Sequence, residues 1–263
     1  MKNFNSLLFE LSSSDRLDVL TLLKKTPLKL SHISSKLDFT VQETSRNMTR
    51  LSGAKLVKKD ADGAFHLTPY GEEALNLLLG FKFIFKNRDY FIRHALSQFP
   101  PQFRAGLGIL DSFQFVSDVM VSFHNIEKMI AKAEKFVWIL TNQVLVSTIP
   151  YLAQEIKRDG EFRLLMPKDY LPSKEMRDLV TNPVFAKAAR TKKLEMKFLD
   201  RIDVCLCLSE KEVSLLSFPN LEDRLDYLGF RGEEEPAVEW AKLLYEYYWN
   251  RATSQIPEQL IGK

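Results

Sequence analysis

Residues 40–68 read TVQETSRNMTRLSGAKLVKKDADGAFHLT, and the first half of this stretch has the pattern of a helix start. Thr40 and Glu43 stand three residues apart, which is the spacing of a capping box, in which each side chain satisfies a backbone N–H of the other residue. Gly53 is a residue that commonly stops a helix. We therefore predict a helix that begins just after Thr40 and ends near Gly53.

The predicted helix has two distinct faces. Residues three or four apart form a narrow face that we expect to pack inward: Val41, Thr44, Met48 and Leu51. A second face carries uncharged polar residues and one arginine: Gln42, Ser45, Arg46 and Thr49. Such side chains hydrogen-bond to base edges or phosphates in a DNA major groove. We therefore predict that this face binds DNA, with Arg46 and Arg50, one turn apart, as its main anchors.

The second half of the stretch predicts a β-hairpin. Residues 56–59 and 65–68 read as two short strands around the turn Asp60-Ala61-Asp62-Gly63. Three lysines in this region are candidate phosphate ligands: Lys55, Lys58 and Lys59. A helix followed by a hairpin is the order of a winged helix. The acidic turn counts against a hairpin tip that enters a minor groove.

The sequence before the stretch supports the same fold. Ser14 caps a predicted helix that carries Leu17, Leu20 and Leu23, and a shorter helix follows over residues 31–37. Taken alone, residues 40–53 also fit an ordinary amphipathic helix with a solvated polar face. Three helices and a hairpin within about 70 residues favour a winged helix-turn-helix domain instead.

Residues 44–57 resemble the ArsR/MarR-like winged-helix regulators. They match the pattern apolar-x-x-S-R-x-apolar-x-x-L-x-x-x-x-L-V of those families, with a departure at Thr44, where an aliphatic residue is usual. The departure loosens the inward face and leaves the outer face intact. The resemblance implies a DNA-binding function.

Composition places the chain among globular proteins with more than one domain. It has 263 residues, 45% of them hydrophobic and 27% charged, with a net charge of +3. No apolar run long enough for a membrane helix and no signal-peptide pattern occurs, so we expect a cytoplasmic location. Cys205 and Cys207 lie two residues apart on a predicted strand, where a disulfide would be strained. We expect buried thiols there.

A helical, aromatic segment follows the predicted winged helix. Thr68-Pro69 opens a helix, and the region from Phe81 to Phe91 then carries five aromatic residues. Two interpretations are open: these rings form the interface of a homodimer, or they pack under a second domain. We predict three parts: a winged helix-turn-helix domain (1–80), a helical linker and dimerisation segment (81–110) and an α/β domain (111–263).

From residue 114 onward, β and α patterns alternate. The predicted strands are residues 136–140, 162–166, 194–199, 204–208 and 213–218, with an edge strand near 227–230. Helices are predicted around residues 119–130 and 144–157, after Ser173 and Asn182, and from Glu233 to the end of the chain. We therefore expect a two-domain protein of the α+β or α/β class, with a mixed sheet in the second domain.

The whole chain resembles a family of archaeal, largely methanogen, transcriptional regulators. The resemblance is carried by the winged helix, the junction FIRHALSQFPPQF, the α/β domain and the pattern W-x-x-L-L-Y-E-Y-Y-W at Trp240 to Trp249. The sensor domain of this family is similar to a degenerate phospholipase-D-like fold, as in the TrmB-like sugar-responsive regulators. The resemblance implies a homodimer that binds double-stranded operator DNA and responds to an effector through its C-terminal domain.

Motifs for catalysis are missing from the sequence. Phospholipase D chemistry needs H-x-K-x-x-x-x-D, and neither His94 nor His124 has a lysine two residues later. There is no Walker loop, G-x-G-x-x-G, G-x-S-x-G or H-E-x-x-H motif, and no His/Cys group with zinc spacing. We expect no enzymatic activity, no cofactor and no metal, and we interpret each histidine as a surface or capping residue.

Open α/β sheets bind ligands beyond the carboxyl ends of their strands. The residues predicted to lie there, and so to bind an effector, are Thr141, Asn142, Pro167, Lys168, Asp200 and Arg201. Lys168 and Arg201 favour an anionic or polyhydroxylated small molecule, whereas the same residues also serve as ordinary caps and turns. Two functions stay open: a ligand-responsive transcriptional regulator, or a protein-interaction module built on a winged helix that does not bind DNA.

Overall fold

A computed structural model describes residues 3–151, 160–171, 173–181 and 183–255. Contacts divide the chain into two compact units. Unit 1 comprises Met1–Lys82 and Ala105–Gly108, and unit 2 comprises Phe83–Arg104 and Ile109–Lys263. The predicted linker, residues 81–110, is therefore shared between the two units and forms no unit of its own.

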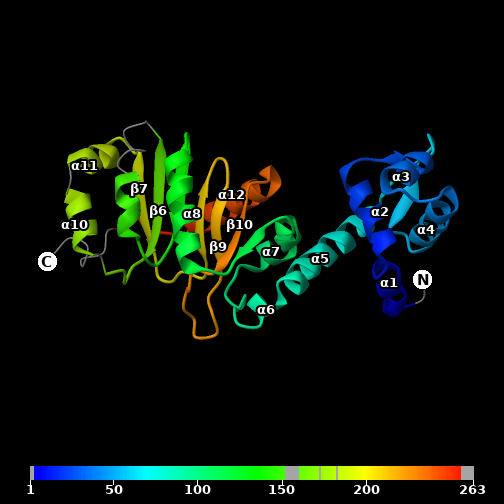
Figure 1. Cartoon of the computed structure of the whole chain (residues 1–263), viewed down its shortest axis with the longest axis horizontal. Coiled ribbons are helices and arrows are strands. Elements are labelled where there is room, and N and C mark those ends of the chain that lie inside the picture. Colours follow the sequence, from blue (N-terminus) through cyan, green and yellow to red (C-terminus); the bar gives the residue numbers. More distant parts are fainter. Residues whose placement is uncertain (1–2, 152–159, 172, 182, 256–263) are drawn as a thin grey trace. The chain divides into compact units, whose positions relative to one another are not determined.

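Unit 1 contains helices and a small antiparallel sheet with the order β1-β3-β2 (Figure 1). Its elements are α1 (Phe4–Leu11), α2 (Ser14–Lys25), β1 (Leu28–Lys29), α3 (Leu30–Leu37), α4 (Val41–Gly53), β2 (Val57–Lys59), β3 (Ala64–Leu67) and most of α5 (Pro69–Lys86). The predicted helices and the hairpin are confirmed. Helix α1 and strand β1 were not predicted, and the N-cap of α2 is Ser13 and not Ser14.

The inward face of α4 differs from the prediction at its first residue. Val41 is 60% exposed, whereas Thr44, Asn47, Met48 and Leu51 are buried. Thr44 tolerates burial because its hydroxyl donates a hydrogen bond to the carbonyl of Thr40 at 2.9 Å, so no polar atom is left unsatisfied. The expectation that Val41 packs inward was wrong.

Unit 2 contains a seven-stranded mixed sheet with the order β4-β10-β9-β8-β5-β6-β7. The strands are β4 (Gln114–Val116), β5 (Phe136–Leu140), β6 (Glu161–Pro167), β7 (Leu194–Leu199), β8 (Cys205–Ser209), β9 (Val213–Ser217) and β10 (Gly229–Gly232). Strands β5, β6 and β7 are parallel, and the other pairs are antiparallel. The predicted mixed sheet is confirmed. The predicted edge strand near residue 230 is an interior strand, because β4 pairs with its outer side.

The helical elements of unit 2 agree with the predicted alternation. They are α6 (Arg88–Phe91), α7 (Pro101–Arg104), η1 (Ala105–Leu110, shared with unit 1), α8 (Val119–Lys132), η2 (Val146–Thr148), α10 (Lys174–Thr181), α11 (Pro183–Arg190) and α12 (Glu235–Trp249). The predicted helix over residues 144–157 lies partly outside the described residues. None of the helices in the described part of the chain is both long and apolar enough to cross a bilayer.

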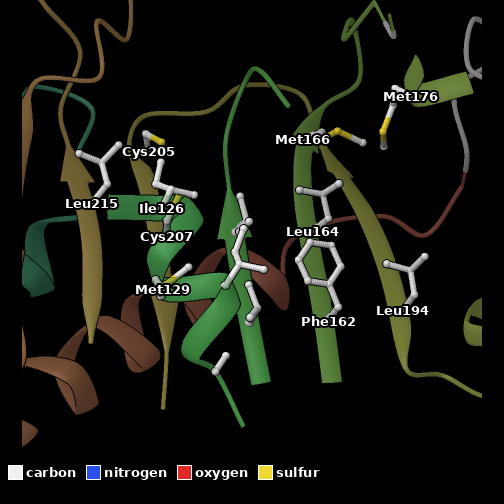
Figure 2. Close-up of a cluster of buried hydrophobic side chains, with 14 of the residues drawn as sticks. Ile126, Met129, Phe162, Leu164, Met166, Met176, Leu194, Cys205, Cys207 and Leu215 are labelled. Carbon is white, nitrogen blue, oxygen red and sulfur yellow. The ribbon is translucent and has the colours of Figure 1, made fainter. Parts of the chain in front are cut away.

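Alternating side chains of the central strands pack on opposite faces of the sheet. Val137 and Ile139 of β5 belong to a core cluster with Ile126 and Met129 of α8, part of which Figure 2 shows. Trp138, between them, stacks on Tyr245 of α12 at 5.1 Å on the other face. Both faces are therefore covered, as the continuous apolar runs predicted.

The aromatic segment is divided between buried and exposed rings. Phe83 and Tyr90 are fully buried in unit 2, where each ring packs against Phe230. The Tyr90 hydroxyl accepts a hydrogen bond from the Phe218 N–H at 2.8 Å. Phe81 and Phe85 are 65% and 60% exposed. Three rings of the segment, including partly buried Phe91, therefore pack within unit 2, and two are solvent-exposed.

His94 is a buried residue, contrary to the expectation of a surface or capping role. Its ring stacks on Tyr90 at 3.7 Å, and its Nδ1 lies 2.9 Å from the Tyr90 carbonyl oxygen. Its Nε2 lies 2.9 Å from a carboxylate oxygen of Asp226. The imidazole therefore joins the segment after α6 to the loop before β10.

Helix α5 approaches Leu56 closely at Gly71. Substitution of Gly71 should therefore affect stability differently from substitution of Gly53. A Cβ on Gly71 would lie 1.9 Å from the Leu56 carbonyl oxygen, whereas a Cβ on Gly53 would meet nothing within 4 Å. Gly71→Ala should destabilise unit 1 by about 1 to 3 kcal/mol, and Gly53→Ala should leave it unchanged or stabilise it by up to about 1 kcal/mol. Thermal unfolding followed by circular dichroism measures both effects.

Tryptophan fluorescence is the internal control for the two glycine variants. Trp138, Trp240 and Trp249 all lie in unit 2. The fluorescence transition should therefore stay constant while the circular dichroism transition of Gly71→Ala moves to lower temperature. Equal stability of the two variants would contradict the packing of Gly71 against Leu56.

Candidate nucleic-acid interface

The outer face of α4 presents the residues that the sequence predicted to bind DNA. Gln42, Ser45, Arg46 and Thr49 are all exposed, and together with Val41 and Arg50 they surround one shallow hollow. The Thr49 hydroxyl donates to the Ser45 carbonyl at 2.9 Å and keeps its lone pairs for an outside donor. Within the described residues, the structure shows no ion pair for Arg46.

The capping box fixes where this face begins. The Thr40 N–H donates to the Glu43 carboxylate at 2.9 Å, and the Glu43 N–H donates to the Thr40 hydroxyl oxygen at 3.2 Å. The side-chain hydrogen bond from Thr40 lowers the pKa of Glu43, and the charge of Arg46 adds to the effect. The helix start that the sequence predicted is confirmed.

Arg50 lies on the same face, but its guanidinium is bound within unit 1. It donates two hydrogen bonds to the Glu10 carboxylate, at 2.9 and 2.8 Å, and its guanidinium carbon lies 5.1 Å above the Phe9 ring. Arg16 forms a second ion pair with Glu10 at 3.1 Å. Both partners of Arg50 come from α1, which the sequence pattern did not predict.

The hairpin lysines are exposed, and each has a different setting. Lys55 adopts a left-handed conformation with φ of 61° just after α4, where the Leu56 N–H bonds back to the Leu51 carbonyl at 3.0 Å. Lys58 pairs in register with His66, and the Lys59 ammonium lies 5.5 Å from the Phe65 ring centre. Lys55 thus lies just beyond the C-terminal end of α4, and Lys58 and Lys59 lie in β2.

The acidic turn of the hairpin has a structural role. An Asp60 carboxylate oxygen accepts a hydrogen bond from the Ala64 N–H at 2.8 Å, and Gly63 has a φ of 84° that suits glycine. Turn formation therefore explains why an aspartate stands at position 60.

The predicted effector residues of unit 2 fall into two groups. Thr141 is buried, and its hydroxyl lies 3.3 Å from the hydroxyl of Tyr227, which donates to Asn142 at 2.7 Å. Tyr227, at a φ of 61°, was not predicted, because its position depends on a loop far along the sequence. It is the ring that joins the first group together.

The second group of predicted effector residues is exposed and charged. Lys168 forms an ion pair with Asp200 at 2.7 Å. Arg201 forms ion pairs with Asp203 at 2.9 Å and with Asp223. The structure therefore brings Lys168 and Asp200 together, as predicted, but each cation already has a carboxylate partner.

No protein-family model matches the chain, and no curated protein matches it either. Solved structures with a similar backbone include TrmBL2, described as an archaeal chromatin protein with a novel mode of DNA binding. It is 13% identical, with a TM-score of 0.43, over 96% of this chain and 100% of that one.

Two further solved structures are similar to parts of the chain. Nuc from Salmonella typhimurium, a phospholipase D family member, is 8% identical, with a TM-score of 0.37, over 48% of this chain and 86% of that one. PhzM, a pyocyanin biosynthetic protein, is 12% identical, with a TM-score of 0.28, over 73% of this chain and 61% of that one. With TM-scores this low, the likenesses assign neither a family nor a function.

The ion pair between Glu10 and Arg50 predicts a pH dependence. The hydrogen bond from Arg50 lowers the pKa of Glu10 from its ordinary value of 4.5, although partial burial opposes the shift. A lowered pKa means that the stabilisation is fully present above about pH 4.5 and is lost as the pH falls through the pKa of the folded state. The Arg50 Nε–H signal in a ¹H–¹⁵N spectrum should therefore keep the chemical shift of the ion pair above pH 4.5 and move toward that of a free guanidinium well below it.

Arg104 is the matched control, because its Nε–H donates to the Phe99 carbonyl oxygen, which does not titrate. Its chemical shift should stay constant through the same pH range. In Glu10→Gln the Arg50 signal should already lie near the free-guanidinium position at neutral pH. An Arg50 chemical shift that is indifferent both to pH and to this substitution would contradict the ion pair.

Proposed function

We propose that this protein is a DNA-binding transcriptional regulator that acts as a homodimer and responds to a small molecule bound in unit 2. The observation that carries the proposal is the outer face of α4, where five polar side chains and Val41 surround a hollow on an exposed helix. A B-DNA major groove is about 12 Å wide and admits one α-helix. The proposal keeps the ArsR-like and TrmB-like resemblance of the sequence and includes no catalytic step.

The side chains on the outer face of α4 are of types that contact DNA bases. Arg46 can form a bidentate contact with guanine, Gln42 can do so with adenine, and the exposed Val41 methyls suit the methyl group of thymine. In this proposal Lys55, Lys58 and Lys59 contact phosphates. Such contacts position a protein on DNA without reading its sequence. The elements α2, α3, α4 and the β2–β3 hairpin follow one another in the order of a winged helix.

Arg50 has a positioning role in this proposal. Its ion pair with Glu10 leaves the guanidinium on the rim of the hollow and reduces the charge it presents to DNA. We therefore assign the stronger DNA contact to Arg46 and a supporting one to Arg50.

Homodimer formation is supported by an apolar stripe on α5. Leu77, Phe81 and Phe85 recur every four residues and are 61%, 65% and 60% exposed, so one face of the helix presents large apolar side chains to solvent. A second copy of the same stripe is self-complementary in a two-fold dimer, and pairing also doubles the DNA contacts.

A protein-interaction module is the second candidate function. Val41 is a large apolar side chain exposed on the same face as Arg46, and such a pair also suits a protein partner. The two candidate functions differ in the salt dependence of binding and in whether DNA is the partner.

Substitution of Arg46 tests the proposed DNA contact. Arg46→Ala should weaken binding of the operator duplex by about 1 to 3 kcal/mol, because a bidentate base contact is lost. Arg224→Ala, at an exposed arginine of unit 2, should bind like the parent. Fluorescence anisotropy at physiological salt measures both. Equal binding by the two variants, with intact folds by circular dichroism, would show that α4 does not contact DNA.

Substitution of Phe81 tests the proposed dimer. Phe81→Glu should shift the protein toward monomer, because a charge in an apolar interface is costly to desolvate. Ile92→Glu is the control, since Ile92 is 69% exposed and lies outside α5. Light scattering at micromolar concentration should distinguish them. A parent protein that is already monomeric, or a Phe81→Glu variant that still dimerises, would rule out the α5 stripe.

A further inference from the structure

Unit 2 contains an apolar cavity of about 40 Å³ next to the central strands. Its walls come from the sheet, from α8, from the segment 143–148 and from α10 and α11, and include Ile139, Phe162, Leu164, Met176, Phe185 and Met196. Figure 2 shows Phe162, Leu164 and Met166 following one another along β6 toward Met176 of α10. In this measure a water molecule needs about 10 to 15 Å³, so the cavity is larger than a packing gap.

Three hydroxyl groups at the cavity already have partners within the protein. The Thr141 hydroxyl donates to the Gln143 carbonyl at 2.9 Å, and the Thr148 hydroxyl donates to the Leu145 carbonyl at 2.6 Å. The Tyr227 hydroxyl is engaged with Asn142, and burial raises the pKa of this phenol, so the group stays neutral. A bound molecule would therefore meet apolar surface and few vacant hydrogen-bonding groups.

The charged residues at the same end of the sheet do not line the cavity. Lys168 and Arg201 are exposed and paired with carboxylates, and neither belongs to the cavity wall. An anionic ligand would have to break these pairs and would still lie outside the enclosed space. The chemistry of the cavity therefore favours an apolar ligand over the anionic or polyhydroxylated one that the sequence suggested.

The methionine side chains at the cavity can repack and so change its volume. Met176 and Met196 line it, and Met129 and Met166 belong to the same core cluster, which therefore holds four of the seven methionines of the chain. Thioether side chains have several rotatable bonds and repack at low cost. An apolar cavity of about 150 Å³ accepts a benzene ring, so this cavity must expand nearly fourfold, by repacking of these side chains, to admit a single ring.

We propose that this cavity binds a small apolar molecule, about the size of one ring and with at most one polar group. Its role as the effector site rests on the proposed function, whereas binding itself does not. Val144 and Leu145 line the cavity and are half-buried, and Tyr227 lines it beside Thr141.

Toluene is a suitable probe, because it is apolar and carries one ring. The full-length protein labelled with ¹³C-methyl methionine is titrated with toluene, with no DNA in the sample. We expect saturable shifts of the Met176 and Met196 methyl signals and no shift of Met48, which lies in unit 1. Glucose 6-phosphate, an anionic and polyhydroxylated probe, should leave all three signals unchanged.

Two Val→Phe substitutions locate the site. Val144→Phe enlarges a side chain that lines the cavity and should weaken toluene binding at least tenfold. Val146→Phe places the same ring on an exposed residue that does not line the cavity, and its affinity should match the parent. Tryptophan fluorescence confirms that unit 2 of each variant is folded.

The outcomes separate this proposal from the DNA-binding proposal. Absence of methyl shifts with toluene, shifts of Met176 and Met196 with glucose 6-phosphate, or equal toluene affinity of the two variants would overturn the apolar site. Each of these results leaves the effect of Arg46→Ala on DNA binding unaffected. Conversely, a protein that binds toluene but no DNA would keep the site and lose its regulatory role.

Discussion

The reciprocal hydrogen bonds between Thr40 and Glu43 are the constraint on which the proposed interface depends. They fix the first residue of α4, and the 3.6-residue period of the helix then decides which side chains point outward. The box holds the first turn in place, and burial of Thr44, Met48 and Leu51 sets the side of the helix that faces outward. Arg46 therefore lies on the exposed side of a helix whose first turn is fixed by the capping box.

Periodicity explains why much of the fold could be predicted. Both faces of β5 are apolar and covered, and this pattern depends on local sequence alone. Prediction failed where a polar group is satisfied by a contact that periodicity cannot show. His94 is buried because its ring nitrogens lie within hydrogen-bond distance of the Tyr90 carbonyl and the Asp226 carboxylate, and Val41 is exposed although it shares the period of Met48 and Leu51.

The candidate site could be predicted only in part, because several of its contacts are far apart in the sequence. The polar face of α4 follows from residue spacing, but the ion pair of Arg50 joins residues 40 positions apart, and no spacing rule identifies Glu10. In unit 2, the buried end of the cavity depends on Tyr227, which is 86 positions from Thr141. The apolar character of the cavity appears only when strands, α8 and α10 are brought together.

The central claim is that the α4 face and the lysines after it bind double-stranded DNA. The most direct measurement is the affinity of the protein for a labelled duplex from the region upstream of its own gene, between about 50 and 200 mM salt. If Arg46, Lys55, Lys58 and Lys59 contact phosphates or bases, log K should fall linearly with log salt, with a slope of roughly −3 to −4 per protomer. Absence of saturable binding, or binding that is indifferent to salt, would contradict the account.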